Sequence, residues 1–490
     1  MLSATPRYPK VAQLLAIIGL FVILAHGGAL LLGSPLRGMA DNGDFWRVAQ
    51  PAGLASSVPV DSLRHRFIVP SYAKRPAYFG EGFSSAALLV WVAANAPWAD
   101  GATLELQQIG ALYVALIAAL FAIALFRGVS PLVCALVAWV LVDPGYLLFC
   151  NSLYADPCAM LGVLGVVVGI WHVRRGHGNP GPALVLVVLG VFLASWSKQS
   201  HFAIGLAAAL PLLAQRKVRR SAAGRLGAFA CILLSLGSVY YFAVGPGYRL
   251  PQINNYNAVF FGIGDVASEP AAALAELGVG AEYRSRAGTN YYEAPVPDDL
   301  ARQLEGLSHA RLARLYLRDS SAMGRALNRT QIALAIQDRY LGNYTYSWRY
   351  PGARVYDEVW AFTHVRQALL RWPIAFWAFL IGLGGWLLSR VARRRELDAS
   401  WGALAFLWLT IAAETASAVL GDGFFGLWRH VIVARFALDI ALAIIIARLL
   451  EWALRAFAQR DRAARMAALN GTATAPSAHG ARGRSRFAWR

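Results

Sequence analysis

The sequence predicts an all-α polytopic membrane protein. Of its 490 residues, 57% are hydrophobic and only 15% are charged, whereas a soluble protein carries about a quarter charged residues. Its mean hydropathy is +0.46, and several windows of roughly 20 apolar residues can cross a hydrocarbon core about 30 Å thick. We expect about ten transmembrane helices: residues 11–33, 104–126, 130–149, 158–173, 182–198, 202–215, 225–244, 373–391, 400–420 and 430–451.

The basic loops predict how these spans are oriented. Lysine and arginine gather before the first span and after the second, fourth, sixth, eighth and last spans: Arg7, Lys10, Arg127, Arg174, Arg175, residues 215–220, residues 389–395 and the tail from Arg455. All of them lie on one side of the membrane if both termini are cytoplasmic. Topology therefore accounts for the formal net charge of +19, and we expect membrane lipids but no nucleic acid as a partner.

The chain is expected to have four regions. The first is a transmembrane module (1–245) whose first outer loop (34–103) carries a short helix at 84–98, too short to span and placed at the outer surface. The others are a small helical outer domain, the last transmembrane helices and a basic, partly disordered cytoplasmic tail: residues 246–371, 372–451 and 452–490. With this topology several polar turns face the same, outer side of the membrane.

The first polar turn, "GMADNGDFWRV" (38–48), leaves the first span and contains Asp41 and Asp44. Asn42 and Gly43 permit a turn that brings the two carboxylates together. Like charges so close raise the pKa of one of them unless a cation intervenes. The turn therefore predicts either a base poised near neutral pH or a divalent-cation site, with Asp44 and Asp156 as its candidate ligands. No cofactor other than such a cation is expected.

Three later turns join the first on the outer side. They are "NSLYADP" (151–157), "WSKQSHF" (196–202) and "GDGFFGLWRH" (421–430), which offer Tyr154, Asp156, Lys198, Gln199, His201, Asp422, Arg429 and His430. A carboxylate can take the proton from an attacking hydroxyl, and cations can neutralise a leaving phosphate. Nucleotide sugars are absent outside the cytoplasm, so the donor would be a sugar carried by a lipid phosphate.

A few other polar residues have a structural interpretation. Asp143, which precedes a proline near a helix end, is expected to be a turn or cap residue. Counting along the spans places Glu414 roughly 12 Å and Arg435 roughly 9 Å below the surface. Ionisable groups at such depth usually pair, so we expect a structural Glu414–Arg435 ion pair, with Asp439 in the same polar interior.

These motifs together resemble GT-C-type integral membrane glycosyltransferases, especially the bacterial glycan-biosynthesis hexose transferases. The resemblance rests on "DNGDFWRV", "NSLYADP", "SKQ" (197–199), "NNYNAVFFGIG" (254–264), "LAELGVG" (274–280), "LYLRD" (315–319), "LGNY" (341–344) and "GDGFFGLWRH", and it extends over most of residues 10–450. It implies a polyprenyl-phosphate sugar donor, transfer on the periplasmic face of the bacterial inner membrane, and a glycan, lipid or protein acceptor.

The resemblance also implies roles for the residues. Asp41 or Asp44 would be the catalytic aspartate, with a slight preference for Asp41 because it leaves the membrane first. Asp156, with Tyr154, would be the second acid that binds the acceptor or a metal. The lipid phosphate would be held by cationic and polar side chains: Lys198, Gln199, His201, Arg429 and His430.

Two other functions fit parts of the pattern. A lipid-linked polysaccharide ligase would use the same donor class and the same cations, but no acid in the first outer loop. A lipid or sugar transporter is expected to have broken helices or repeated halves with polar groups near the midplane. Here the polar groups gather at one surface, which favours the transferase.

Overall fold

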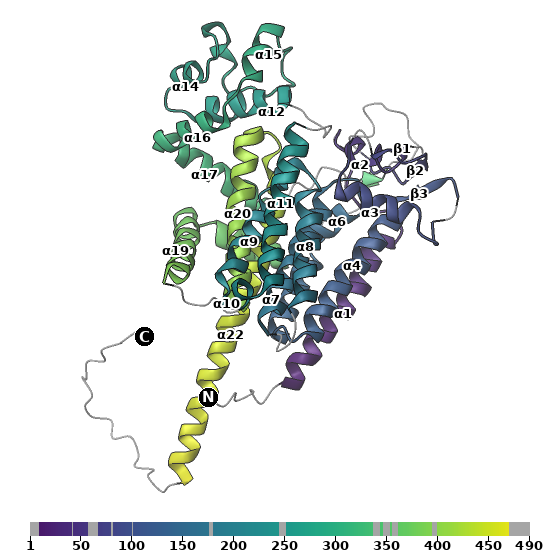
Figure 1. Cartoon of the computed structure of the whole chain (residues 1–490), viewed down its shortest axis with the longest axis vertical. Helices are drawn as coiled ribbons and strands as arrows, with labels where there is room; N and C mark the ends of the chain where they lie inside the picture. The colour runs from purple at the N-terminus through teal and green to yellow at the C-terminus, as the bar shows by residue number, and fades with distance from the viewer. Residues whose placement is uncertain are drawn as a thin grey trace, which may run out of the picture.

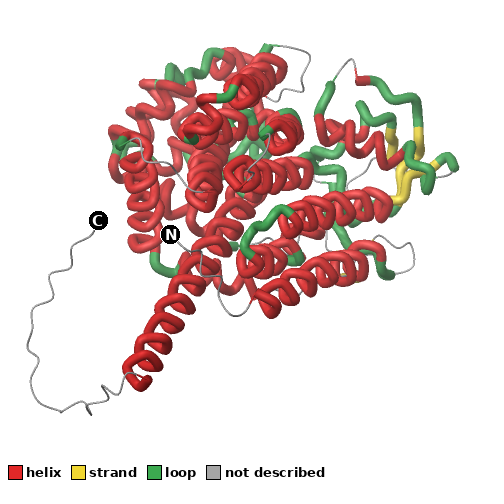
Figure 2. Tube along the Cα trace, turned by 60° about the horizontal axis from the view of Figure 1, so that its bottom comes forward, coloured by secondary structure: helices red, strands yellow, loops and turns green. Residues whose placement is uncertain are grey.

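The computed structural model describes residues 9–41, 43–56, 67–79, 82–99, 101–175, 180–244, 251–336, 344–345, 353–354, 361–393 and 399–469. Most of them are helical, and the longer strands gather at one corner of the molecule (Figures 1 and 2). The last residues expected in the disordered tail, 470–490, lie outside the described part of the chain.

Six of the described helices are long and apolar enough to cross a membrane: α1 (Pro9–Leu32), α4 (Leu106–Phe126), α7 (Asp156–Arg175), α11 (Ala222–Ala243), α19 (Pro373–Ala392) and α20 (Ala399–Asp422). A bent pair, α5 (Pro131–Leu141) and α6 (Pro144–Cys150), makes a seventh if it counts as one span. The chain is therefore a multi-pass membrane protein.

The remaining expected spans are helices that lack the length or the composition of a simple span. α8 (Gly181–Ser195) and the apolar stretch Gln199–Ala214, which joins η2 (Gln199–His201) to α9 (Ile204–Ala214), are short. α22 (Ile432–Leu469) is long, but its apolar half carries Arg435, Asp439 and Arg448. The expected count of ten spans consequently stays a prediction.

Asp143 and Pro144 produce the bend of 64° between α5 and α6. Proline has no N–H to continue a helix, but it fits the first position of a new one. The Asp143 side chain caps that new helix, because its Oδ1 accepts a hydrogen bond from the Gly145 N–H at 2.8 Å. The expectation that Asp143 is a cap residue is confirmed.

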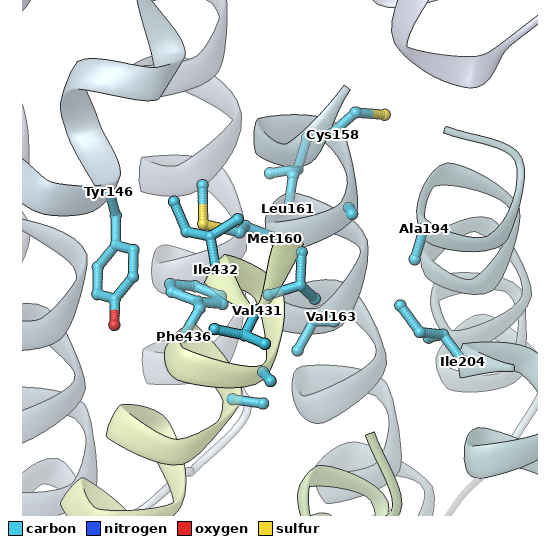
Figure 3. Close-up of a cluster of buried hydrophobic side chains, with 14 of the residues drawn as sticks. Tyr146, Cys158, Met160, Leu161, Val163, Ala194, Ile204, Val431, Ile432 and Phe436 are labelled. Atoms are coloured by element: carbon cyan, nitrogen blue, oxygen red, sulfur yellow. The ribbon is translucent and has the colours of Figure 1, made fainter. Parts of the chain in front are cut away.

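α7 is the central helix of the bundle and packs against α4, α8, α20 and α22. Figure 3 shows apolar side chains of α7 meeting those of neighbouring helices: Tyr146, Cys158, Met160, Leu161, Val163, Ala194, Ile204, Val431, Ile432 and Phe436. Gly162 and Gly190 let α7 and α8 approach closely, since a Cβ added at either would collide with the backbone of the other helix. α7 is almost wholly buried and begins at Asp156. Its packing therefore holds Asp156 in place beside the polar turns.

The first outer loop contains a small sheet that the all-α prediction missed. β1 (Leu54–Ser56), β2 (Ser71–Lys74) and β3 (Thr103–Glu105) pair antiparallel in the order β1-β2-β3, and the short α2 (Trp46–Ala49) precedes them. Strands of three or four residues carry too little period-2 pattern to be read from sequence. The helix expected at 84–98 is present as α3 (Ser85–Ala94), whose N-cap Ser84 accepts from the Ala87 N–H.

The second segment that we expect to lie outside the membrane, residues 246–371 (the second outer region), is mainly helical in its described part. It contains α12 (Pro251–Ala258), the π-helix η3 (Val259–Ile263), α13 (Gly264–Val266), α14 (Pro270–Glu276), η4 (Ala281–Arg286), α15 (Asp298–Glu305), α16 (His309–Arg318), α17 (Ser320–Ala335), β4 (Tyr344–Thr345), β5 (Ala353–Arg354) and α18 (Ala361–Leu370). In Figure 1, α12 and α14 to α16 lie beyond one end of the bundle. That this region is a separate domain stays a prediction.

Two basic segments lie at the other end of the bundle. α10 (Arg216–Arg220) and the C-terminal half of α22 are found at the lower end in Figure 1, the end at which α1 begins. The first outer loop and α12 lie toward the upper end. Basic loops and polar turns are thus segregated along the bundle, as the charge pattern predicts.

The expected Glu414–Arg435 ion pair is wrong. Arg435 donates through Nη2 to the carbonyls of Ala333 (2.9 Å) and Trp428 (2.8 Å), while Glu414 contacts His201. Counting residues along two antiparallel helices gives depth but not the face of the helix, and Arg435 faces α17. Its buried neighbour Asp439 pairs instead with Arg366 of α18.

The Arg366–Asp439 pair fastens the second outer region to the bundle. Both side chains are 1% exposed or less, and Tyr146 donates its hydroxyl to Asp439 Oδ2 at 2.6 Å. Thr363, one helical turn before Arg366, donates to Asp143 Oδ2 at 2.6 Å. These contacts join α18 to α6 and α22.

We predict that Asp439→Asn lowers the free energy of unfolding by about 3–5 kcal/mol, because it leaves Arg366 buried without its counter-charge. Asp461→Asn is the matched control in the same helix. The Arg465–Asp461 pair is exposed (65% and 44%), so its loss should change the free energy by no more than about 0.5 kcal/mol. Denaturant titration in detergent measures both, and equal losses for the two variants would contradict the prediction.

Candidate functional site

The two acids of the first polar turn have different surroundings. Asp41 Oδ1 accepts hydrogen bonds from the N–H groups of Gly43 (2.7 Å) and Phe45 (3.1 Å), so this carboxylate holds the turn that leads into α2. Gly43 has a φ of 102°, a left-handed conformation that favours glycine. The turn therefore directs the Asp44 side chain elsewhere, toward α21 (Leu427–His430).

Asp44 lies between two arginines. Its Oδ2 is 3.0 Å from Arg429 Nη1, and its Oδ1 is 3.4 Å from Arg47 Nη2. Burial alone would raise the pKa of the Asp44 carboxyl, but nearby positive groups lower it to about 2: Arg429, Arg47, Lys198 and His430. Since Lys198 and His430 contribute, the polar turns that carry them lie within electrostatic range of Asp44. A cation, rather than a second acid, sets the charge state of this carboxylate.

Tyr154 joins the first outer loop to Arg429. Its hydroxyl donates to the Ala40 carbonyl at 3.0 Å, and its ring makes an edge contact with Phe45 at 4.8 Å between centroids. The Arg429 guanidinium lies 5.8 Å from the ring centroid, within cation–π range. Tyr154 is buried, and its position suits an orienting role more than direct contact with a large acceptor.

A second acid–base group surrounds Asp156 at the start of α7. Lys198 Nζ lies 3.9 Å and His201 Nε2 3.5 Å from Asp156 Oδ1. On its other side, His201 Nδ1 lies 2.6 Å from Glu414 Oε2. Among the described residues, neither oxygen of Asp156 has a hydrogen-bond partner. The Asp156 carboxylate is thus held by electrostatic attraction to Lys198 and His201, and its oxygens accept no hydrogen bond from the described residues.

The turn between α20 and α21 forms the third part of the site. His430 Nε2 lies 3.0 Å from Asp422 Oδ2, and the Asn257 side chain donates to Asp422 Oδ1 at 2.8 Å. Burial lowers the pKa of His430 in spite of Asp422. The side-chain oxygen of Asn257 in turn accepts from the Tyr291 N–H at 2.9 Å. This network ties the second outer region to the bundle.

Glycines allow that network to form. Gly423, with a φ of 58°, lies so close to α12 and η3 that an added Cβ would be 2.5 Å from the Asn257 carbonyl oxygen and 2.9 Å from the Gly262 nitrogen. The π-helix η3 bends at Gly262, whose φ and ψ are −104° and −106°. Short π-helices often occur at functional sites. Here the π-helix carries Gly262 against Gly423, beside the hydrogen bond from Asn257 to Asp422.

The structure brings most of the candidate residues together. Contacts join Asp44, Tyr154, Arg429 and His430, whose Nε2 lies 3.4 Å from Arg429 Nη2. The pair of Asp156 and Lys198 lies within electrostatic range of this group, and together they form one cluster. His201 belongs to it but has no exposed side-chain surface, so it cannot contact a lipid phosphate in this conformation. Gln199 is exposed, and Asp41 is occupied by the turn.

Several site residues were not expected from the sequence. Arg47 lies in α2, three residues after Asp44, but only its 3.4 Å contact identifies it as a partner of Asp44. Asn257 belongs to the motif "NNYNAVFFGIG", which marks the segment without showing which amide reaches the site. Glu414 was assigned to Arg435, and its contact with His201 could not be read from residue counting.

The described residues contain no group of three or more histidine, cysteine or acidic side chains placed to share a metal ion. The two candidate ligands, Asp44 and Asp156, contact cationic side chains of different turns. These contacts suit anion or hydroxyl binding by the surrounding groups. A divalent cation at this site stays a prediction.

Comparison with solved structures found a protein of similar but distant fold. One similar solved structure is the archaeal oligosaccharyltransferase AglB from Archaeoglobus fulgidus in complex with an inhibitory peptide and a dolichol-phosphate. It is 13% identical, with a TM-score of 0.36, and the match covers 92% of this chain and 52% of that one. The chain thus spans about half the length of that protein.

No curated protein matches the sequence. Residues 4–467 match the family described as the YfdI N-terminal transmembrane domain, which accounts for nearly all of the described chain. The protein belongs to the YfdI N-terminal transmembrane domain family.

Proposed function

We propose that this protein is a GT-C-type glycosyltransferase that moves a single sugar from a polyprenyl-phosphate donor to a glycan, lipid or protein acceptor. The observation that carries the proposal is the meeting of two carboxylates, Asp44 and Asp156, with the cations Arg429 and Lys198 at one end of a membrane bundle. In such an arrangement the acids can accept a hydroxyl proton and the cations can stabilise a leaving phosphate.

The cations provide a site for the donor phosphate. Arg429 Nε has no hydrogen-bond partner among the described residues, whereas Nη1 pairs with Asp44 Oδ2 at 3.0 Å. A donor phosphate would therefore accept from Nε and compete with Asp44 for Nη1. Lys198 and His430 are 14% and 12% exposed, which leaves them accessible at the edge of the cluster. Because burial lowers the pKa of His430, it would supply a hydrogen bond and Lys198 the charge. Positive groups at this position stabilise the negative charge that grows on the leaving phosphate.

In the proposed reaction the acceptor hydroxyl oxygen attacks the anomeric carbon, and the bond from that carbon to the phosphate oxygen breaks. The electron pair leaves with the polyprenyl phosphate, and the hydroxyl proton passes to a carboxylate of the site. Direct displacement inverts the anomeric configuration. We assign the proton acceptor to Asp44 rather than Asp41, because Asp41 already accepts two backbone N–H groups.

A pKa of about 2 makes the resting Asp44 a weak base. The donor would change this, since its phosphate competes for Arg429, the strongest positive influence on Asp44. Once Arg429 is shared with the phosphate, its hold on the carboxylate weakens and the carboxylate becomes more basic. Donor binding would thus prepare Asp44 for the proton of the acceptor.

The orientation follows from the segregation of charge. The basic segments α10 and the end of α22 lie at the opposite end of the bundle from the candidate site (Figure 1). Basic loops face the cytoplasm, so we place the site on the periplasmic face of a bacterial inner membrane, with both termini cytoplasmic.

We predict that Asp44→Asn lowers transfer by about 10²–10⁴-fold, because the amide cannot accept the proton. Asp41→Asn should have a smaller effect, since an amide oxygen can still accept the N–H groups of the turn. The measurement is transfer of radiolabelled sugar from polyprenyl-phosphate sugars by purified protein in nanodiscs. Anomeric analysis of the product should show inversion.

The control for these variants is Asp461→Asn, at an exposed acid remote from the site. A double variant, Asp41→Asn with Asp44→Asn, separates the transferase from its nearest alternative. A lipid-linked polysaccharide ligase relies on arginine and histidine, so full activity of the double variant would support the ligase and refute the proposed base.

We further predict that Lys198→Gln raises the KM for the donor about 10–100-fold, since a charge-assisted contact to phosphate contributes about 1.5–3 kcal/mol. The KM for the acceptor should rise less, because His201 still lies beside Asp156 in the variant. Lys217→Gln in α10 makes the same chemical change on the exposed basic end and should leave both constants unaltered. An unchanged donor KM in Lys198→Gln would argue against the assigned phosphate site.

A further inference from the structure

Tyr292 is an exposed aromatic side chain at the edge of the candidate site. It belongs to the turn between η4 and α15, and it is 64% exposed. Its ring centroid lies 5.4 Å from that of Phe425 in the α20–α21 turn, and the two ring planes are inclined by 39°. A single exposed tyrosine is ordinary on a protein surface. Two rings that come from distant segments and pack together beside the site form a surface that a ligand can use.

The α20–α21 turn buries one phenylalanine and presents the next. Gly423 and Gly426, which flank the two phenylalanines, have φ angles of 58° and 55°, the left-handed conformation that favours glycine. Phe424 is 8% exposed, and the Arg329 guanidinium lies 4.7 Å from its ring centroid. Phe425 is only half-buried and packs against Tyr292. The turn therefore fixes Phe425 at the surface.

The turn that carries Tyr292 is held as firmly. The Tyr292 N–H donates to Asn290 Oδ1 at 3.0 Å, and the Tyr291 N–H donates to Asn257 Oδ1 at 2.9 Å. The Tyr291 ring makes edge contacts with Tyr292 and Tyr256, at 5.4 and 5.9 Å between centroids. Asn257 also bonds the α20–α21 turn, so one network holds both exposed rings. A surface that is already ordered loses little entropy when a ligand binds to it.

Charged groups of the site surround this pair of rings. Asp422, Asp44 and Arg429 all act electrostatically on the Tyr292 hydroxyl. The side chains of Asp44 and Asp422 are 17% and 13% exposed, so these carboxylates are not closed off from a ligand. The negative face of an aromatic ring attracts partly positive C–H groups, and carboxylates accept hydrogen bonds from hydroxyls. A sugar ring carries both kinds of group, and it therefore matches this surface.

Exposure distinguishes the aromatic surface from the proposed phosphate site. The Arg429 and Lys198 side chains are only 8% and 14% exposed, whereas Tyr292 is 64% exposed. The helices of the second outer region that flank Tyr292 also lie beyond one end of the bundle (Figure 1). A lipid-linked donor stays in the bilayer, so a ring this exposed is better placed for a molecule that arrives from water.

We propose that Tyr292 and Phe425 form an aromatic subsite that holds a sugar ring of a glycan acceptor beside the carboxylates of the site. The assignment of that ring to the acceptor rests on the proposed function, whereas the binding of a sugar does not. Exposed tyrosines also occur in the aromatic belt at a membrane surface. The packing of Tyr292 against Phe425, within electrostatic range of Asp44 and Asp422, favours the sugar subsite.

Sugar binding is tested without any donor. The probe is the mixture of oligosaccharides released by mild acid from a bacterial cell envelope, added to the purified full chain in nanodiscs, and saturation-transfer NMR gives the apparent Kd. We expect the Kd to rise about 3–10-fold in Tyr292→Leu and in Phe425→Leu, the loss typical of one aromatic contact. Tyr292→Phe keeps the ring and should bind more tightly than Tyr292→Leu.

The matched control is Tyr78→Leu, the same change at a tyrosine of the first outer loop that is 59% exposed; it should leave the Kd unaltered. Thermal unfolding shows whether each variant is folded. Absence of binding by the wild-type protein, or equal binding by folded Tyr292→Leu, overturns the proposal.

The aromatic-belt alternative is tested by thiol labelling. All four native cysteines are buried, so Tyr292→Cys adds the exposed thiol. A water-soluble maleimide should label Tyr292→Cys in nanodiscs but not Leu233→Cys, a change at a 51% exposed position in the middle of α11. Equal resistance of the two variants would place residue 292 against lipid and overturn the sugar subsite.

The assignment to the acceptor is tested by transfer kinetics. Tyr292→Leu should raise the KM for the glycan acceptor about 3–10-fold and change kcat and the donor KM much less. A rise confined to the donor KM would assign the ring to the donor sugar and overturn the acceptor assignment.

The two proposals fail in different ways. Oligosaccharide binding that weakens in Tyr292→Leu, in a protein that transfers no sugar from any polyprenyl-phosphate donor, supports the subsite and refutes the proposed function. Active transfer with wild-type oligosaccharide binding and acceptor KM in folded Tyr292→Leu overturns the subsite and leaves the proposed function standing.

Discussion

Pairing of buried charge is the constraint on which the polar end of this protein depends. Asp44 requires Arg429, Asp156 requires Lys198 and His201, and Asp439 requires Arg366. Each pair joins segments that are far apart in the sequence, because a buried charge without a partner is strongly unfavourable. The pairs therefore determine which turn lies against which. The same contacts that assemble the fold also collect the groups proposed to bind and transfer a sugar.

Charge pairing explains why the site has two unequal halves. Asp44 is held by arginines of short helices, and under the proposed function the donor phosphate would compete with Asp44 for one of them, Arg429. Asp156 is held from inside the bundle by His201 and Glu414, where no ligand reaches. One acid is thus linked to groups that can exchange partners, and the other to groups that cannot. Such a division suits the proposed function: the Asp44 half could exchange an ion pair when the donor binds, while the Asp156 half keeps its side chains in place.

Much of this arrangement could be predicted from the sequence, and the limits are physical. Apolar length located the helices, and alternating basic loops indicated that the polar turns share one end. Residue counting could not show the helix face, so Glu414 was paired with Arg435 instead of His201. It also could not distinguish the roles of Asp41 and Asp44. The difference is that two backbone N–H groups of the turn donate to Asp41, whereas Asp44 faces Arg429. The three short strands carried too few residues for their alternation to be detected.

The contact between Gly423 and Gly262 has a consequence for how substrates reach the cluster. Backbone approaches backbone there with no side chain between, and the Asn257 amide bonds Asp422 alongside it. α12 and the α20–α21 turn must consequently move as one body, and parting them would break both contacts at once. A molecule could enter between these two segments only by breaking both contacts, so together they form a continuous wall beside Asp422 and His430.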